Sequence, residues 1–120
     1  IWPVRPAKVT SGFGMRDGAM HNGLDLSAPK GAPIRAAADG TVIYEGDGLS
    51  GYGNLIILDH GGGYTTIYAH NDDNRAALGE RVKQGEVIGF VGETGRASNP
   101  HCHFEIRRKT RALNPLDYLP

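Results

Sequence analysis

Polar and apolar residues alternate along His101–Ile106, near the end of the printed sequence. A period of two is typical of a β-strand, in which neighbouring side chains point to opposite faces. His101, His103 and Glu105 are therefore expected together on a solvent-facing side. The opposite, apolar side is expected in the core and carries Cys102, Phe104 and Ile106.

Several other segments also show strand patterns. The near-continuous apolar run Asn54–Asp59 predicts a central strand, and Tyr64–His70, rich in β-branched and aromatic residues, predicts its partner. Two more strands are predicted, one at Val82 and one over Val87–Val91. Within Ile34–Tyr44 the pattern predicts two short strands that meet in a hairpin at Asp39-Gly40.

The segments between these strands are polar or rich in glycine. His60–Gly63 predicts a surface loop with His60 as a turn residue, and Asn71–Gly79 has room for one helical turn at most. Asn114–Leu119 predicts a short terminal turn that packs Leu116 and Leu119 back on the core. The chain is therefore expected to be mainly β, a compact antiparallel sheet domain with little helix.

Composition agrees with this picture and narrows the partners. A length of 120 residues predicts an extended arm over residues 1–10 and a single domain over residues 11–120, and 18 glycines fit many tight turns. Lys+Arg and Asp+Glu balance at 13 each, which predicts no nucleic-acid partner and no strongly charged membrane-binding surface. One cysteine excludes an intrachain disulfide, and no apolar run reaches transmembrane length. Because the sequence starts at Ile1 and not at Met, we expect a piece of a longer protein, without its targeting signal.

His101 and His103 are candidates for chemistry. Two imidazoles on one strand face, roughly 6–7 Å apart at Cα, suit a metal centre, although a solvated strand face explains the pair as well. His21 and Asp25 would lie about 13 Å apart on a straight strand, too far to share one zinc ion. A bend or bulge at Asn22-Gly23, which glycine permits, would bring them together.

One arrangement uses all of these residues and a fifth. With a water molecule, His21, Asp25 and His103 would complete a tetrahedral catalytic zinc site with an open position. His70, at a strand end, and His101 would then be free to accept or donate protons beside it. The spacing alone does not decide which histidine has which role.

Two other interpretations stay open at this point. Two histidines and a carboxylate also hold non-haem iron in oxygenases, although in other spacings. A lipoyl-type carrier has a similar Val-x-x-Gly hairpin pattern. It needs a lysine at a hairpin tip, however, and neither Lys30 nor Lys83 has such a setting.

The motifs in their order resemble the M23 (lysostaphin/LytM-type) peptidoglycan endopeptidases over residues 8–118. The resemblance rests on His21-x-x-x-Asp25, Tyr68-Ala69-His70 and His101-x-His103-Phe104-Glu105. It extends through Ser11-Gly12-Phe13-Gly14-x-Arg16, Gly31-x-Pro33-Ile34-x-Ala36, Gly51-Tyr52-Gly53-Asn54, Val82-x-x-Gly85 and Gly92-x-Thr94-Gly95.

This resemblance implies one zinc ion per chain on His21, Asp25 and His103, with His70 and His101 as the catalytic histidines. It also implies hydrolysis of a peptide bond in the cross-links of cell-wall peptidoglycan, in a groove across the sheet. The usual residue between the last two histidines is leucine, and Cys102 replaces it here as a small apolar residue. We expect Arg16, Tyr52 and Asn99 to line the substrate groove.

In detail the chain looks closest to those members of the family that are envelope proteins of bacterial cell division, which implies a location in the cell envelope. Some of those members have lost metal ligands and activate separate amidases. A non-cutting module that binds peptidoglycan or an amidase is therefore the alternative function, with a division protein as a further partner. Because all five key positions are kept, an active enzyme is expected. The same similarity favours a direct D-alanyl cross-link over a glycine bridge as the bond that is cut.

Overall fold

The computed structural model describes the backbone of residues 1–120 and every side chain except that of Arg16. Its strands are β1 (Val9–Ser11), β2 (Gly14–Arg16), β3 (Ala19–His21), β4 (Leu24–Ser27), β5 (Pro33–Arg35), β6 (Gly40–Gly46), β7 (Asn54–Gly61), β8 (Tyr64–Asn71), β9 (Asp73–Asn74), β10 (Arg81–Val82), β11 (Val87–Phe90), β12 (His101–Arg108) and β13 (Arg111–Leu113). A short 3-10 helix, Pro115–Asp117, follows them.

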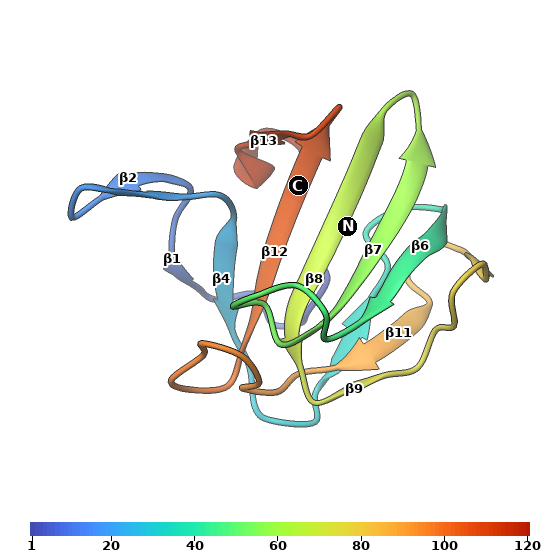
Figure 1. The fold of residues 1–120 in the computed structure, drawn as a ribbon, viewed down its shortest axis with the longest axis horizontal. Coiled ribbons are helices and arrows are strands. Elements are labelled where there is room, and N and C mark those ends of the chain that lie inside the picture. The colour runs from blue at the N-terminus through green and yellow to red at the C-terminus, as the bar shows by residue number, and fades with distance from the viewer.

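The strands form one large sheet and two small ones (Figure 1). The large sheet has eight strands. Seven follow one another in the order β1-β4-β12-β8-β7-β6-β10, and the eighth, β13, pairs with the C-terminal part of β12 beyond β4. Strands β5, β11 and β9 form a second sheet, and β2 pairs with β3 in a hairpin that projects from the body. Every pairing between these strands is antiparallel. The predicted fold class is confirmed.

The main core lies on one face of the large sheet, against the second sheet. Phe104 and Tyr68, neighbours in the β12–β8 register, are fully buried there with ring centroids 5.3 Å apart. Ile34 of β5 and Ile88 of β11 pack into the same cluster from the second sheet. Burying each such side chain stabilises the fold by roughly 1.5–3 kcal/mol.

The predicted central strand is confirmed, because β7 pairs with both β6 and β8. Its apolar run serves two faces. Ile56 and Leu58 belong to the main core, whereas Leu55 packs with Ile67 and Ala69 in a smaller cluster on the other side of the sheet. A continuous apolar run is expected for a strand that is covered on both faces.

Three details differ from the sequence prediction. Asp39-Gly40 does not close a hairpin, because β5 pairs with β11 and β6 pairs with β7 and β10, so the dipeptide joins two sheets. His60 belongs to β7, where its ring is bonded to Asp39 O and Thr66 Oγ1. Leu116 is 49% exposed and does not return to the core, whereas the other predicted anchor, Leu119, packs against it.

The first ten residues contain the start of β1, and Val4 is 1% exposed within the main core. The boundary after residue 10 stays a prediction. None of the described elements is a helix with the length and apolar character needed to cross a membrane.

Candidate metal centre

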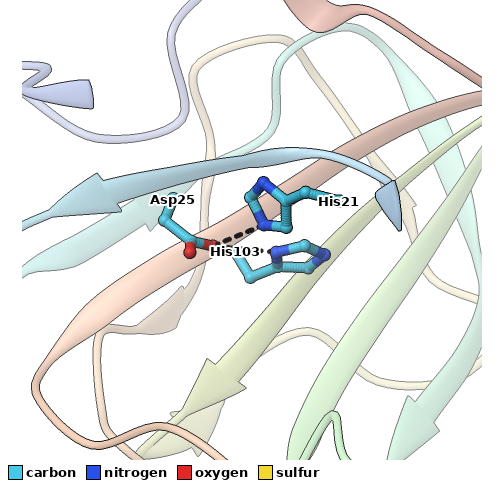
Figure 2. A group of neighbouring side chains, drawn as sticks. All are labelled: His21, Asp25 and His103. Carbon is cyan, nitrogen blue, oxygen red and sulfur yellow. Dashed lines mark hydrogen bonds and ion pairs between the residues drawn. The ribbon is translucent and has the colours of Figure 1, made fainter. Parts of the chain in front are cut away.

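Three side chains from separate strands converge above the face of the large sheet that lies opposite the main core (Figure 2). His21 ends β3, Asp25 lies in β4 and His103 lies in β12. Their ligand atoms all lie within 4.8 Å of one another. These are the residues that the sequence predicts as metal ligands, and the structure brings all three together.

The predicted break at Asn22-Gly23 is present, because β3 ends at His21 and β4 begins at Leu24. Gly23 sits against β12, where an added Cβ would lie 2.3 Å from the carbonyl oxygen of Phe104. Only glycine fits at this close approach. The bend turns the side chains inward, so that His21 Nε2 lies 3.3 Å from Asp25 Oδ1, and Asp25 directly faces His103 in the β4–β12 register.

Three of the four histidines around this point are held through Nδ1 by a backbone carbonyl. The bonds are His21 to Gly12 O at 2.7 Å, His70 to Thr94 O at 2.7 Å and His101 to Asn99 O at 2.9 Å. A carbonyl oxygen can only accept, so Nδ1 carries the proton in each ring. In their neutral forms these three rings therefore keep a lone pair on Nε2, the atom available to a metal ion or a proton.

His103 is arranged the other way round. Its Nδ1 lies 2.9 Å from Asp25 Oδ1, and its Nε2 lies 2.7 Å from Glu105 Oε2. Burial alone would lower the pKa of His103, but its bonds to the two carboxylates outweigh burial and raise the pKa to about 9. In the metal-free protein the ring is therefore a cation at neutral pH, and it must release its Nδ1 proton to act as a ligand.

Asp25 is the hub of the cluster. Its Oδ1 lies 2.9 Å from His103 Nδ1, 3.3 Å from His21 Nε2 and 3.6 Å from His101 Nε2. Burial would raise the pKa of Asp25, but the His103 hydrogen bond and the nearby imidazoles outweigh it and lower the pKa below 3.8. The carboxyl group is therefore ionised at neutral pH.

These residues fit a zinc ion. Tetrahedral zinc with bonds near 2.0–2.1 Å separates its ligand atoms by roughly 3.3 Å, close to the spacing around Asp25 Oδ1. Two imidazoles and one carboxylate are the ligand types of an open, catalytic zinc site. The coarser prediction of a metal centre therefore agrees with the donor set and its geometry.

His70 and His101 form a pair beside the cluster, with ring centroids 4.8 Å apart. His70 has φ +66°, a conformation that is uncommon for a residue with a side chain and that recurs at functional sites. Its backbone N–H donates to Tyr52 O at 2.9 Å, which helps to hold this conformation. Burial lowers the pKa of His70, so the ring is neutral at pH 7 with a free lone pair on Nε2.

A groove of about 520 Å³ opens over these side chains. Two loops, residues 47–53 and 92–100, lie at the same end of β4 and β12 (Figure 1), and they supply much of the groove wall. Tyr52 and Asn99, both predicted groove residues, line it. The side chain of Arg16, the third predicted groove residue, lies outside the described part of the structure.

Glu105 corrects the expectation of a wet strand face. It is 0% exposed, although it shares its side of β12 with the two histidines. Its carboxylate accepts hydrogen bonds from Tyr52 and Arg107, which cover it. Arg107, two residues further along the same strand, thus has a buried partner. The period-two pattern placed Glu105 on the same face as the two histidines, but it carried no information about burial.

Comparisons with known proteins agree with this geometry. The model of peptidase family M23 matches residues 19–115. The murein hydrolase activator NlpD of Escherichia coli is 45% identical over 99% of this chain, and the DD-carboxypeptidase/endopeptidase Mpg of Neisseria meningitidis is 41% identical over 97% of it. This chain covers 31% and 28% of those two proteins, about a third of their length.

A solved structure is similar as well. The zinc-containing peptidase from Vibrio cholerae superposes with a TM-score of 0.85 at 34% identity, over 94% of this chain and 37% of that one. The match argues against the iron-oxygenase and lipoyl-carrier interpretations. The chain belongs to peptidase family M23.

Proposed function

We propose that this domain is a zinc metallopeptidase that hydrolyses peptide cross-links of bacterial cell-wall peptidoglycan. One observation carries the proposal: four imidazoles and one carboxylate converge at the groove. One nitrogen of each imidazole is held by a hydrogen bond to a group outside this set, Nδ1 in three rings and Nε2 in His103. Zinc at such a site supplies a Lewis acid that polarises a peptide carbonyl and makes water more acidic.

The residues divide into two groups in this proposal. His21, Asp25 and His103 hold the metal ion, while His70 and His101 move protons. His70 is neutral and accepts a proton at Nε2 during attack by water. In this step a protonated His101 donates from Nε2 to the carbonyl oxygen, while neutral His70 accepts a proton at its own Nε2.

The substrate is assigned to the peptide part of peptidoglycan. The groove is open to solvent and broad enough for an extended peptide. Mpg is named a DD-carboxypeptidase/endopeptidase, which supports a direct D-alanyl cross-link rather than a glycine bridge as the bond cut by this chain. A domain that acts on peptidoglycan would be located in the cell envelope.

A second function has specific support. NlpD, named as an activator of murein hydrolases, is 45% identical to this chain. The domain could therefore dock on an amidase and stimulate it without cutting. The complete histidine and aspartate set favours cutting, because an activator has no need for a metal site whose four rings all have fixed tautomers.

Purified sacculi and defined cross-linked wall peptides distinguish the two functions. We expect the protein to bind one zinc ion and to release soluble muropeptides, and chelation should stop the release. Mass analysis of the fragments identifies the bond. A protein that binds no zinc and releases nothing, yet stimulates an amidase, would establish the activator function instead.

A further inference from the structure

Glu105 is a buried carboxylate with no part in the metal-ligand set. Its side chain is fully buried, and both of its oxygens are bonded. Oε1 accepts from Arg107 Nε at 2.6 Å, and Oε2 accepts from the Tyr52 hydroxyl at 2.9 Å and from His103 Nε2 at 2.7 Å. A buried ion pair is weak evidence of a stabilising role, because apolar residues of similar size often stabilise a fold equally well. The location of Glu105 directly behind His103 indicates another role.

His103 differs from the other three histidines of the cluster in which ring nitrogen faces the metal site. The other rings are anchored through Nδ1 by backbone carbonyls and present Nε2. His103 presents Nδ1 to the cluster, and its anchor at Nε2 is a side chain. An ionised carboxylate can only accept, so Glu105 requires a proton on Nε2. A neutral His103 then has its lone pair on Nδ1, facing Asp25 and His21.

We propose that Glu105 is a positioning residue that sets the tautomer and orientation of His103 for metal binding. Arg107 and Tyr52 bond to the carboxylate from its other sides, while its own hydrogen bond to His103 Nε2 orients the imidazole. The negative charge of Glu105 also makes the ring a stronger ligand. This inference rests on the zinc site of the proposed function.

The first test compares zinc dissociation constants by competition with a chromogenic chelator. Glu105→Gln replaces the carboxylate with a neutral amide, which accepts more weakly and can also donate to Nε2. We expect zinc affinity to fall about 10- to 100-fold, the usual effect of losing a residue that orients a metal ligand.

Arg107→Gln is the matched control. It breaks the same buried ion pair but leaves the Glu105–His103 hydrogen bond in place, so zinc affinity should stay within about threefold of the wild type. Equal affinity in the wild type and Glu105→Gln would overturn the proposal. An equal loss in both variants would also overturn it, because the ion pair and not the bond to His103 would then matter.

Stability of the metal-free proteins separates positioning from a structural role. Denaturant unfolding should show both variants destabilised, since each removes a partner from a buried pair. A purely structural Glu105 would change unfolding and leave zinc affinity unchanged.

A further test needs no variant. In the zinc-loaded wild-type protein, nitrogen-15 spectra of the histidine rings should show His103 protonated at Nε2 and unprotonated at Nδ1. The opposite tautomer would overturn the proposal even if Glu105→Gln failed to fold. Wild-type protein that binds no zinc would overturn the proposed function and this inference together. Zinc binding and cleavage that are unchanged in Glu105→Gln would overturn this inference alone.

Discussion

The two faces of β12 show how one strand can serve two purposes. Cys102, Phe104 and Ile106 alternate with His101, His103 and Glu105, and all six are wholly or largely removed from solvent. The first three contact apolar neighbours and stabilise the sheet through buried area. The other three are held by directed hydrogen bonds. His101 bonds locally to Asn99 O, whereas His103 bonds to Asp25 and Glu105 to Tyr52, both far away in the sequence. Packing is therefore concentrated on one face, and groups that can bind a metal or move protons are concentrated on the other.

The largest expected effect comes from His103→Ala on the polar face. Zinc binding should be lost, and muropeptide release should fall by at least about 1,000-fold, because the residues around the metal act as a unit. Far-UV circular dichroism should stay that of a β protein, since the apolar face of β12 is untouched. Metal analysis and sacculus digestion measure the two effects, and retained zinc with full activity would contradict the ligand role.

His101→Ala should separate proton transfer from metal binding. We expect the variant to keep most of its zinc and to lose about 100- to 10,000-fold in turnover, the usual contribution of a general acid or base. His60→Ala is a matched control, because His60 lies outside the metal groove and should leave both quantities unchanged. Loss of zinc in His101→Ala would show that the roles of His101 and His103 are divided wrongly.

Phe104→Ala tests the opposite face. Removing this fully buried ring should lower the free energy of unfolding by about 3–5 kcal/mol, measured by denaturant titration. The molecules that remain folded should still bind one zinc ion. A folded variant without zinc would show that the two faces are not energetically separable.

A smaller effect should appear with pH in the metal-free protein. The folded-state pKa of His103, about 9, lies above its ordinary value of 6.5. The stability that this shift contributes is fully present below pH 6.5 and is lost as the pH rises through 9. Denaturant unfolding at pH 6 and pH 9.5 should therefore show lower stability at the higher pH.

Zinc and acid provide the controls for this pH effect. The alkaline loss should disappear with zinc bound, because the ligand ring then carries no Nδ1 proton at either pH. The pKa values of Asp25 and Glu105 are lowered, so their contributions are present above the ordinary values of 3.8 and 4.5 and are lost toward acid. An alkaline loss of equal size in the zinc-loaded protein would contradict the assignment to His103.

Much of the fold could be predicted from local patterns. The alternation in β12 follows from backbone geometry, which repeats every two residues in any strand. The apolar run of β7 follows from cover on both faces of that strand. The hairpin at Asp39-Gly40 was wrong because turn chemistry does not specify which strands pair. The Asp39 side chain instead accepts a hydrogen bond from the Gln84 backbone N–H, a partner that the local sequence does not predict.

The sequence could propose which residues form the candidate site, but it could not predict how their side chains are arranged. Residue types and the M23 resemblance identified His21, Asp25, His70, His101 and His103. The rest depended on contacts between distant segments, such as the carbonyls of Gly12 and Thr94 that fix two ring tautomers. The left-handed backbone of His70 has no sequence signal, since it is imposed by the surrounding contacts.

The sequence by itself determined the β class and the strand faces, because these follow from side-chain chemistry and a period of two. The M23 resemblance then supplied the residues of the candidate site. Only the tertiary structure decided that Glu105 is buried and that Arg107 and Tyr52 hold it against His103. Burial and hydrogen-bond partners are properties of neighbours in space. Tyr52 meets Glu105 only when the loop that precedes β7 lies against β12.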